Sequence, residues 1–460
     1  MSKFIYMDNA ATTAVRQEVV DAMVPYFTES YANPSSVYSF AQKTKNDMEE
    51  ARETIASILG AAKPNEIYFT GGGSESDNWA LKAAAEAFKS KGNHIITTKI
   101  EHHAILHTCE WLEKHGYEVT YLDVDEYGKV DPIEFEAAIK DTTILASIMF
   151  ANNEIGTVEP IKELGAIAHS KGVIFHTDAV QAFAHIPINV QEMNIDMLSA
   201  SGHKFHGPKG IGFLYVSNKV KIGSFIHGGS QERSRRAGTH NVPGIIGMAK
   251  AASIANTNMS ENIKNISAIR DHIIDRVLAE IPYSRVNGDR TDRLPGNVHF
   301  CFRFIEGESM LIMLDQKGIC GSSGSACTSG SLDPSHVLLA IGLPHEIAHG
   351  SLRLSLGEDA TIEDADYVVD ELKSVVRRKF PSKEIAINKL LMMMSFEYVY
   401  TPETIESGLF DIRDVKDYPV LYTAIIEDVD ILVTGDKDFS DIDVEKPEIM
   451  SPAQFMEKFL

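Results

Sequence analysis

Cysteine, tryptophan and long apolar segments are scarce in this sequence. Its 460 residues include 4 Cys and 2 Trp. The cysteines, at positions 109, 301, 320 and 327, do not form the paired framework of a disulfide-rich secreted domain. No basic-then-apolar signal opens the chain, and no apolar run approaches the ~20 residues that a membrane span requires. These absences predict a cytoplasmic protein with reduced thiols and no membrane partner.

Positive charge is also in deficit. The chain has 43 Lys and Arg against 65 Asp and Glu, which gives a net charge of −22. Such a balance disfavours direct binding of nucleic acid. The deficit is uneven, because residues 383–460 contain 7 basic and 17 acidic residues and none of the 17 His or 4 Cys. This shift in composition predicts a separate C-terminal module.

The remaining composition is that of an ordinary globular protein, with 44% hydrophobic and 23% charged residues. The length predicts about two to four domains. Apolar strand-like segments alternate with amphipathic helical ones, which is typical of α/β proteins with helices on both faces of a parallel sheet. Strands are predicted at 66–70, 94–98, 142–150 and 173–176, and helices at 16–27, 43–59, 77–89 and 362–378.

A lysine between two imidazoles follows a further apolar run. Lys204 lies in Ser-Gly-His-Lys at 201–204, between His203 and His206, and a glycine-rich turn comes next. Crowding and nearby cations can keep such an amine deprotonated enough to attack a carbonyl carbon. A lone loop lysine is more often only solvated. The assignment therefore depends on the residues that follow the other strands.

Polar side chains follow three of the other predicted strands: His102, then Asn153, then Asp178 and Gln181. Ligands of open α/β sheets bind beyond the carboxyl ends of the strands. A carboxylate such as Asp178 can keep a pyridine nitrogen protonated, and an aromatic ring such as His102 can stack on a cofactor. Each residue alone has a structural alternative, as a helix cap or a core histidine. Their order and spacing together indicate a pyridoxal phosphate site.

A glycine-rich turn between a strand and a helix predicts where the phosphate of such a cofactor would bind. Residues 71–73 are glycines and Ser74 follows them. Glycine allows close approach of the backbone, and the free N–H groups of a helix start favour an anion. Ser201 and His203 are expected to add contacts. Alone, the turn is weak evidence, because many such turns bind nothing.

A second reactive group is predicted in a run of glycine and serine. Cys327 lies in Gly-Ser-Ala-Cys-Thr-Ser-Gly-Ser at 324–331, a loop that suits a nucleophile that must move. A redox pair or metal clip with Cys320 is the alternative, but no second Cys-x-x-Cys or His-x-x-His supports a metal site. We therefore predict no metal. Cys109, Cys301 and Cys320 are expected to be structural.

Together these motifs resemble those of the NifS/IscS-type cysteine desulfurases, pyridoxal phosphate (PLP) enzymes of the class V aminotransferase family. The resemblance covers roughly residues 3–380. It is carried by the stretches 6–13, 33–36, 71–78, 101–102, 152–156, 178–181, 201–204, 236–239 and 324–331. It implies the α/β PLP-dependent transferase fold type I, with a mainly parallel sheet between helices in a large domain at 16–256. The smaller α+β domain would combine 1–15 with 257–380 and carry the Cys327 loop.

The resemblance also implies a role for each candidate residue. Lys204 would hold the cofactor, His102 would stack on it and Cys327 would attack the substrate sulfur. Asn153 and Arg353 would bind the substrate, and a planar guanidinium suits its carboxylate. The cofactor-binding residues would be Gly73, Ser74, His102, Asn153, Asp178, Gln181, Ser201, His203, Lys204 and, from the partner subunit of a homodimer, Thr239.

The implied reaction converts L-cysteine to L-alanine and leaves the sulfur as a Cys327 persulfide. An iron–sulfur scaffold or a sulfur carrier for tRNA thiolation would receive it. The alternatives are a selenocysteine lyase or another PLP β-lyase or aminotransferase, although an aminotransferase has no need of the Cys327 thiol. Two residues depart from the family pattern: Tyr38 stands where many relatives have histidine, and His240 stands where an acid is common.

Residues 385–460 resemble the C-terminal half of a PIN domain, a metal-dependent RNA nuclease fold. Asp417 and Asp436 match two of its acidic metal ligands, with Asp438 beside them. The first essential aspartate of that family has no counterpart here. We therefore expect a small, truncated α/β fragment without nuclease activity, with a helix at 414–426 and a strand at 429–434. An RNA nuclease or RNA-binding activity of this tail is the alternative from another class.

Overall fold

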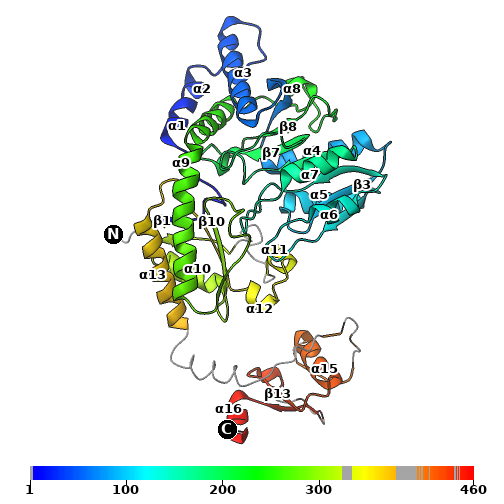
Figure 1. The fold of residues 1–460 in the computed structure, drawn as a ribbon, viewed down its shortest axis with the longest axis vertical. Coiled ribbons are helices and arrows are strands. Elements are labelled where there is room, and N and C mark those ends of the chain that lie inside the picture. The colour runs from blue at the N-terminus through cyan, green and yellow to red at the C-terminus, as the bar shows by residue number, and fades with distance from the viewer. Residues whose placement is uncertain are drawn as a thin grey trace. The chain divides into compact units, whose positions relative to one another are not determined.

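A computed structural model shows the chain as two compact units, residues 1–379 and 380–460 (Figure 1). The structure describes residues 4–323 and 334–379, and within 401–459 all residues except 403, 404, 406, 407, 414, 440, 441, 443 and 445. The predicted nucleophile Cys327 lies outside the described residues. None of the helices within the described ranges combines the length and the apolar character that crossing a membrane requires.

A seven-stranded sheet forms the centre of the first unit (Figure 1). Only β8 is antiparallel to its neighbours in this sheet, and the other neighbouring strands are parallel. The mainly parallel sheet of the predicted fold class is therefore confirmed. The strands lie in the order β2 (Ile67–Thr70), β8 (Gly212–Val216), β7 (Met197–Ser201), β6 (Ile174–Asp178), β5 (Thr143–Ser147), β3 (His94–Thr98) and β4 (Glu118–Leu122).

The central strands of this sheet are buried throughout, because helices cover both of its faces. Successive side chains of a strand point to opposite faces, so Ile95 and Ile96 of β3 belong to two different hydrophobic clusters. Helices α4 (Gly73–Phe88) and α5 (His103–Glu113) contribute to the cluster of Ile95. The cluster of Ile96 is formed with α3 (Ser39–Leu59), α6 (Pro132–Ala138), α7 (Ile161–Ser170) and the first half of α9 (Val242–Glu280).

A second set of strands lies beside the other half of α9. The antiparallel order is β12 (Ser351–Ser355), β10 (Asn297–Phe302) and β9 (Ser284–Val286), and β1 (Ile5–Tyr6) pairs in parallel with β11 (Ile319–Cys320). The domain boundary predicted at residue 256 falls inside α9, which is 39 residues long. The shorter helices are α1 (Gln17–Met23), α2 (Pro25–Thr28), α8 (Gln231–Ser234), α10 (Gly307–Asp315), α11 (His336–Ala340) and α12 (His345–Ala348).

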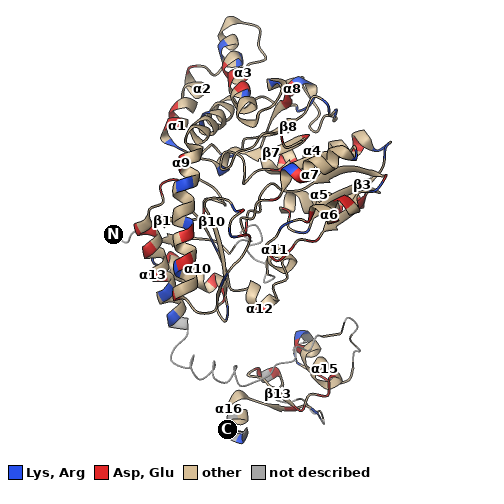
Figure 2. Cartoon of the chain, viewed as in Figure 1, with Lys and Arg blue, Asp and Glu red and all other residues tan. Residues whose placement is uncertain are grey.

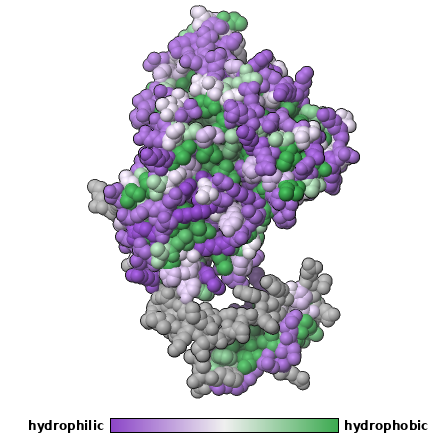
Figure 3. All heavy atoms as spheres, viewed as in Figure 1, coloured by the Kyte–Doolittle hydropathy of each residue, from purple (hydrophilic) through white to green (hydrophobic). Residues whose placement is uncertain are grey.

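Ion pairs join α9 to α13 (Ile362–Lys379), and both of these helices carry residues of both signs of charge in Figure 2. Arg276 binds Asp366 at 2.9 Å and Asp370 at 2.7 Å, and Lys373 binds Glu280 at 2.7 Å. The outer surface of the unit is mostly hydrophilic in the view of Figure 3, with smaller hydrophobic areas between. Most apolar residues of the unit are thus buried, and the two clusters of Ile95 and Ile96 against the sheet contain many of them.

The second unit contains a small α/β arrangement at the predicted positions. Strand β13 (Ile431–Val433) pairs in parallel with β14 (Glu448–Met450). Helix α15 (Tyr418–Ile426) precedes β13, and α16 (Pro452–Phe459) ends the unit. The predicted helix at 414–426 is therefore a 3₁₀ turn, Val415–Asp417, followed by α15, because Pro419 occupies the first turn of the α-helix.

Candidate active site

The ends of several strands of the large sheet meet at one cavity of about 450 Å³. Residues that follow β3, β5, β6 and β7 line it, together with the start of α4, one residue of β12 and the N-terminal segment. It therefore brings together most of the residues predicted from the sequence. These are Gly73, Ser74, His102, Asn153, Asp178, Gln181, Ser201, His203, Lys204 and Arg353.

Two predicted residues are not in this group. Thr239 is exposed and does not line the cavity of its own chain. Cys327 belongs to residues 324–333, which the structure does not describe. The predicted partner-subunit role of Thr239 and the predicted thiol chemistry of Cys327 therefore stay predictions.

Lys204 ends the 3₁₀ turn Gly202–Lys204 directly after β7. Its Nζ donates hydrogen bonds to the carbonyl oxygens of Ala10 at 2.7 Å and Ala11 at 3.0 Å. The Gln181 side chain also donates to the Ala10 oxygen, at 2.9 Å. The N-terminal segment thus holds the Lys204 amine at the cavity wall through two uncharged carbonyl acceptors. The amine can leave these acceptors when a ligand enters the cavity.

His102 presents a neutral ring to the cavity. It is the N-cap of α5, and its Nδ1 accepts the Ala104 N–H at 3.1 Å, so the ring proton of the neutral form is on Nε2. Burial, together with the Lys204 ammonium and three neighbouring histidines, lowers the pKa of His102 to about 4. A neutral aromatic ring at pH 7 is suited to stacking on a planar ligand.

Asp178 is the last residue of β6 and is 6% exposed. One carboxylate oxygen accepts the Val180 N–H at 2.9 Å, which leaves the other for a ligand. Burial raises the pKa of Asp178 to about 6, although the Val180 N–H and Lys204 act in the opposite direction. A protonated ring nitrogen placed here would stabilise the carboxylate form.

A second buried acid, Asp77, lies beside Asp178 and was not predicted to belong to the site. It is 1% exposed, lines the same cavity and has a hydrogen bond from Ser199. Burial raises its pKa well above the usual range, and the Asp178 charge adds to this shift. Asp77 follows Ser74 by one helical turn inside the stretch 71–78, so the sequence held a local signal for it.

The glycine-rich turn disfavours side chains, through lack of room at Gly73 and through its backbone conformation at Gly72. A Cβ atom on Gly73 would lie 2.6 Å from Cγ2 of Val180, and Gly72 has a φ of +151°. Helix α4 begins at Gly73, four residues earlier than predicted, so Gly73 and Ser74 are its first residues, and both line the cavity. An adjoining recess shares Gly73, Ser74, Ser201 and His203 with the cavity and adds Lys209.

Arg353 lies in β12 and is 2% exposed. Its Nη1 donates to the Asn153 carbonyl at 2.9 Å, and its Nη2 donates to Oδ1 of Asp8 at 2.9 Å. Asp8 therefore orients the guanidinium at the edge of the cavity. No local pattern in the sequence indicates this contact, because 345 residues separate the two side chains.

Residues 5–368 match the family described as Aminotransferase class-V. The cysteine desulfurase IscS of Clostridium botulinum (strain Hall) is 57% identical over 381 residues, which cover 82% of this chain and 96% of that protein. The chain belongs to the NifS/IscS-type cysteine desulfurases of the class V aminotransferase family. The cysteine desulfurase IscS of Methanosarcina thermophila is 56% identical over 377 residues, covering 82% of this chain and 93% of that protein.

Solved structures agree with this membership. A NifS-like protein has a TM-score of 0.77 at 37% identity, over 82% of this chain and all of that one. SspA in complex with cysteine has a TM-score of 0.68 at 38% identity, over 76% of this chain and 98% of that one. The prediction of a desulfurase of PLP fold type I is confirmed, and this cysteine desulfurase belongs to a PLP-dependent family.

The cavity of this cysteine desulfurase fits that cofactor. The recess lined by Gly72, Gly73 and Ser74 lies at the start of helix α4, where a helix favours an anion such as a phosphate. The buried Asp178 carboxylate matches a pyridinium nitrogen, the neutral His102 ring matches an aromatic face, and the Lys204 amine matches an aldehyde carbon. The three groups come from the ends of three neighbouring or near-neighbouring strands, so one planar ligand can meet them all.

The second unit also brings predicted residues together. Carboxylate oxygens of Asp417, Asp436 and Asp438 lie within 4.8 Å of one another. Asp436 is exposed and the other two are partly exposed, and Arg413 forms an ion pair with Asp438. The family match ends at residue 368, so the comparisons do not extend to this cluster.

Proposed function

We propose that this cysteine desulfurase stores the sulfur of L-cysteine as a persulfide on Cys327 and that Lys204, His102, Asp178 and Arg353 form its catalytic site. The observation that carries this proposal is the convergence of these four side chains on one cavity. An amine, an aromatic ring, a carboxylate and a guanidinium are the four groups needed to hold PLP and an α-amino acid together. The Cys327 part rests on its sequence context.

In this proposal, PLP when bound supplies an electron sink for the substrate Cα. Asp178 holds the proton of the ring nitrogen, and His102 covers one face of the ring and excludes water. Gly73, Ser74, Ser201 and His203 hold the phosphate, while Asn153 and Gln181 contact the ring. Lys204 holds the cofactor, and its Nζ is also the group that moves the proton of the substrate Cα.

Arg353 binds the substrate carboxylate in this proposal. Its guanidinium is already fixed by Asp8 and the Asn153 carbonyl, so little side-chain freedom is lost when the substrate enters. The thiolate of Cys327 then attacks the substrate sulfur. A new S–S bond forms as the substrate C–S bond breaks, and L-alanine is released after Cα and Cβ regain protons.

The partners of the enzyme belong to the proposal as well. A homodimer would place the partner's Thr239 at the phosphate, which agrees with the exposure of Thr239 on its own chain. An iron–sulfur scaffold or a sulfur carrier for tRNA thiolation would accept the persulfide sulfur. The expected cytoplasmic location and the PIN-like, nuclease-inactive nature of residues 385–460 stay predictions from the sequence.

The test is alanine release from L-cysteine, under reductant, by the full chain and two variants. Lys204→Ala should lower the rate by about a thousandfold or more, because the proton-transfer group is lost. Cys327→Ser should also stop turnover but should keep the yellow colour of the bound cofactor. Normal turnover by Cys327→Ser would contradict the proposal and favour a selenocysteine lyase or another β-lyase, which faster turnover of L-selenocysteine would identify.

A further inference from the structure

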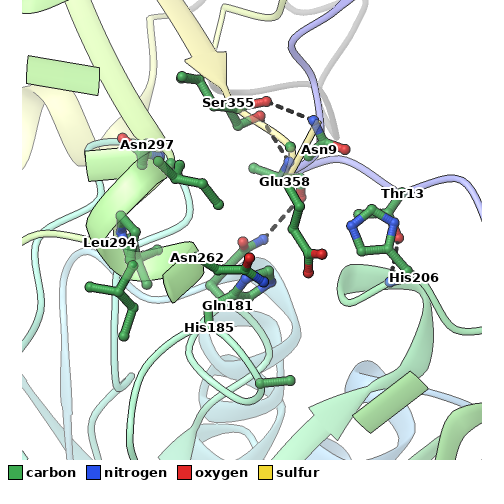
Figure 4. A pocket seen from close by; sticks show the side chains of 18 of the residues that line it. Asn9, Thr13, Gln181, His185, His206, Asn262, Leu294, Asn297, Ser355 and Glu358 are labelled. Carbon is green, nitrogen blue, oxygen red and sulfur yellow. Dashed lines mark hydrogen bonds between the residues drawn. The ribbon is translucent and has the colours of Figure 1, made fainter. Parts of the chain in front are cut away.

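A second cavity, here called the junction cavity, adjoins the candidate active site (Figure 4). The two cavities share Ala10 and Gln181, and the remaining residues of the junction cavity are its own. Its volume is about 60 Å³, which has room for about four water-sized groups. The junction cavity is therefore too small for a cofactor but large enough for a small polar ligand.

Apolar and polar side chains both line the junction cavity, and Asn262 of α9 is among the polar ones. Met259, Ile263 and Ile266 of α9 supply apolar side chains, as does Leu294. The remaining polar side chains come from chain segments that lie far apart in the sequence. Figure 4 shows the Glu358 side chain between Gln181 and His185 on one side and Thr13 and His206 on the other.

Each of the two histidines that line the junction cavity, His185 and His206, keeps one ring nitrogen whose lone pair a ligand can use. His185 Nε2 lies 3.0 Å from the Lys204 carbonyl oxygen, and His206 Nδ1 lies 3.0 Å from the Ala14 carbonyl oxygen. A carbonyl only accepts, so these nitrogens carry the ring protons. Burial lowers the pKa of both rings, which keeps them neutral. His185 Nδ1 and His206 Nε2 are then acceptors, without a protein partner within the described residues 4–323 and 334–379.

Three other polar side chains that line the junction cavity direct their donors to backbone carbonyls. The Asn9 amide donates to the Ser355 carbonyl at 2.9 Å, and the Gln181 amide donates to the Ala10 carbonyl at 2.9 Å. The Thr13 hydroxyl donates to the His203 carbonyl at 3.0 Å. What these three side chains leave for a ligand is oxygen lone pairs, whereas the amide of Asn262, which also lines the cavity, can both donate and accept.

The charged lining residue of the junction cavity also favours a ligand that donates hydrogen bonds. Glu358 is the only ionisable acid among its described lining residues, and no Lys or Arg lines it. Glu358 forms an ion pair with Arg16, and both side chains are partly exposed, at 21% and 26%. The carboxylate therefore lies where a ligand can compete with Arg16 for it.

We propose that the junction cavity binds a small organic cation that carries N–H donors, namely a protonated amine or a guanidinium group. Such a cation supplies the donors that the two imidazoles and the amide oxygens lack, and it matches the Glu358 charge. Its carbon atoms would lie against the isoleucines of α9. The occupied cavity would contact His185, which holds the Lys204 carbonyl, so the ligand would lie one residue away from the catalytic lysine.

The test is the binding of methylguanidinium to the full-length, cofactor-loaded protein, measured by ligand-observed saturation-transfer NMR at constant ionic strength. Methylguanidinium should bind saturably. Tetramethylammonium has the same charge but no N–H donor, and it should not bind. Equal binding of the two cations, or no binding of methylguanidinium, would overturn the proposal.

Two variants of one ion pair locate the ligand. Glu358→Gln removes the carboxylate and should weaken methylguanidinium binding by about tenfold or more, whereas Arg16→Gln removes its competitor and should strengthen binding. A general loosening of the fold would shift both variants in the same direction. The matched control is Glu346→Gln, an exposed acid outside the cavity, which should bind as the unchanged protein does. Unchanged binding by Glu358→Gln would also overturn the proposal, whatever the desulfurase activity.

Discussion

The candidate active site of the first unit and the acidic cluster of the second unit assemble charged side chains in opposite ways. In the first unit, groups of both signs surround a cavity, and backbone atoms of the N-terminal segment and of the loop after β6 fix Lys204 and Asp178. In the second unit, three acids of one sign, Asp417, Asp436 and Asp438, lie near the surface. Buried groups of opposite charge that are held in place can do chemistry on a ligand, whereas exposed like charges are common without any ligand.

The largest effect is expected on the free energy of unfolding, when a buried ion pair of the first unit is broken and compared with an exposed ion pair of the second unit. In the first unit Arg52 binds Glu232 at 2.8 Å, with 2% and 1% of the side chains exposed. Glu232→Gln leaves the buried guanidinium with Glu49, which is 45% exposed, as its remaining charge partner, and should lower the free energy of unfolding by about 3–5 kcal/mol. Chemical denaturation followed by fluorescence measures this difference.

The same pair predicts a pH dependence of stability. Burial alone would raise the pKa of Glu232, but hydrogen bonds from His240 and Arg52 outweigh burial and lower it from 4.5 to about 2. The stabilisation is therefore present above about pH 4.5 and is lost as the pH falls toward 2. The control is the exposed pair Lys458–Glu448 of the second unit, with 50% and 57% exposed side chains. Lys458→Gln should leave the unfolding midpoint unchanged, and an equal loss in both variants would contradict the comparison.

A second prediction concerns cofactor binding at the buried carboxylate. The pKa of Asp178 is raised by burial to about 6, so the carboxylate of the apoprotein is protonated below this pH. The affinity for PLP should then fall by up to about tenfold per pH unit below pH 6. The cofactor phosphate titrates in the same range, so the measurement is the difference from Asp178→Asn in equilibrium titrations. Parallel pH profiles of the two proteins would show that Asp178 does not pair with the ring nitrogen.

A third prediction concerns the contact that the sequence did not reveal. Asp8→Asn removes the charge that orients Arg353 and should raise KM for L-cysteine severalfold, with little change in kcat. Steady-state alanine release measures both constants. Asn9→Ala, which changes the next side chain, should leave KM nearly unchanged. A fall in kcat without a change in KM would instead place Asp8 in the chemical step.

The smallest effect is expected for the second unit. Asp436→Asn removes one acid of the exposed cluster and should leave alanine release unchanged, because the family match ends at residue 368. The measurement is the rate of alanine release with and without added Mg²⁺. A change in rate of twofold or more would show that the acidic cluster acts on the desulfurase, and the contrast between the two regions would then fail.

Most residues of the candidate active site could be predicted, because the sequence patterns that indicate them are local. His102, Asp178 and Lys204 each follow an apolar strand, and parallel strands bring such positions to one edge of a sheet. The start of α4 was predicted four residues too late, since glycines and serine at a helix start have low helix propensity.

The remaining features depend on contacts across long stretches of chain. Asp8 and Arg353 meet only because β1 and β12 lie in the same part of the fold, and neither position has a periodic signal. The junction cavity needs segments from residue 9 to residue 358. Its hydrogen-bond preference follows from backbone carbonyls, such as that of Lys204, which a sequence does not display. Long-range pairing of this kind requires the folded structure.

The most direct test of the account is mass spectrometry of the protein after reaction with L-cysteine, before any reductant is added. The account predicts one additional sulfur atom on the peptide that contains Cys327, together with an equal amount of L-alanine. Lys204→Ala should show neither product. Alanine without sulfur on Cys327, or sulfur on Cys320 instead, would contradict the assignment of Cys327 as the sulfur acceptor.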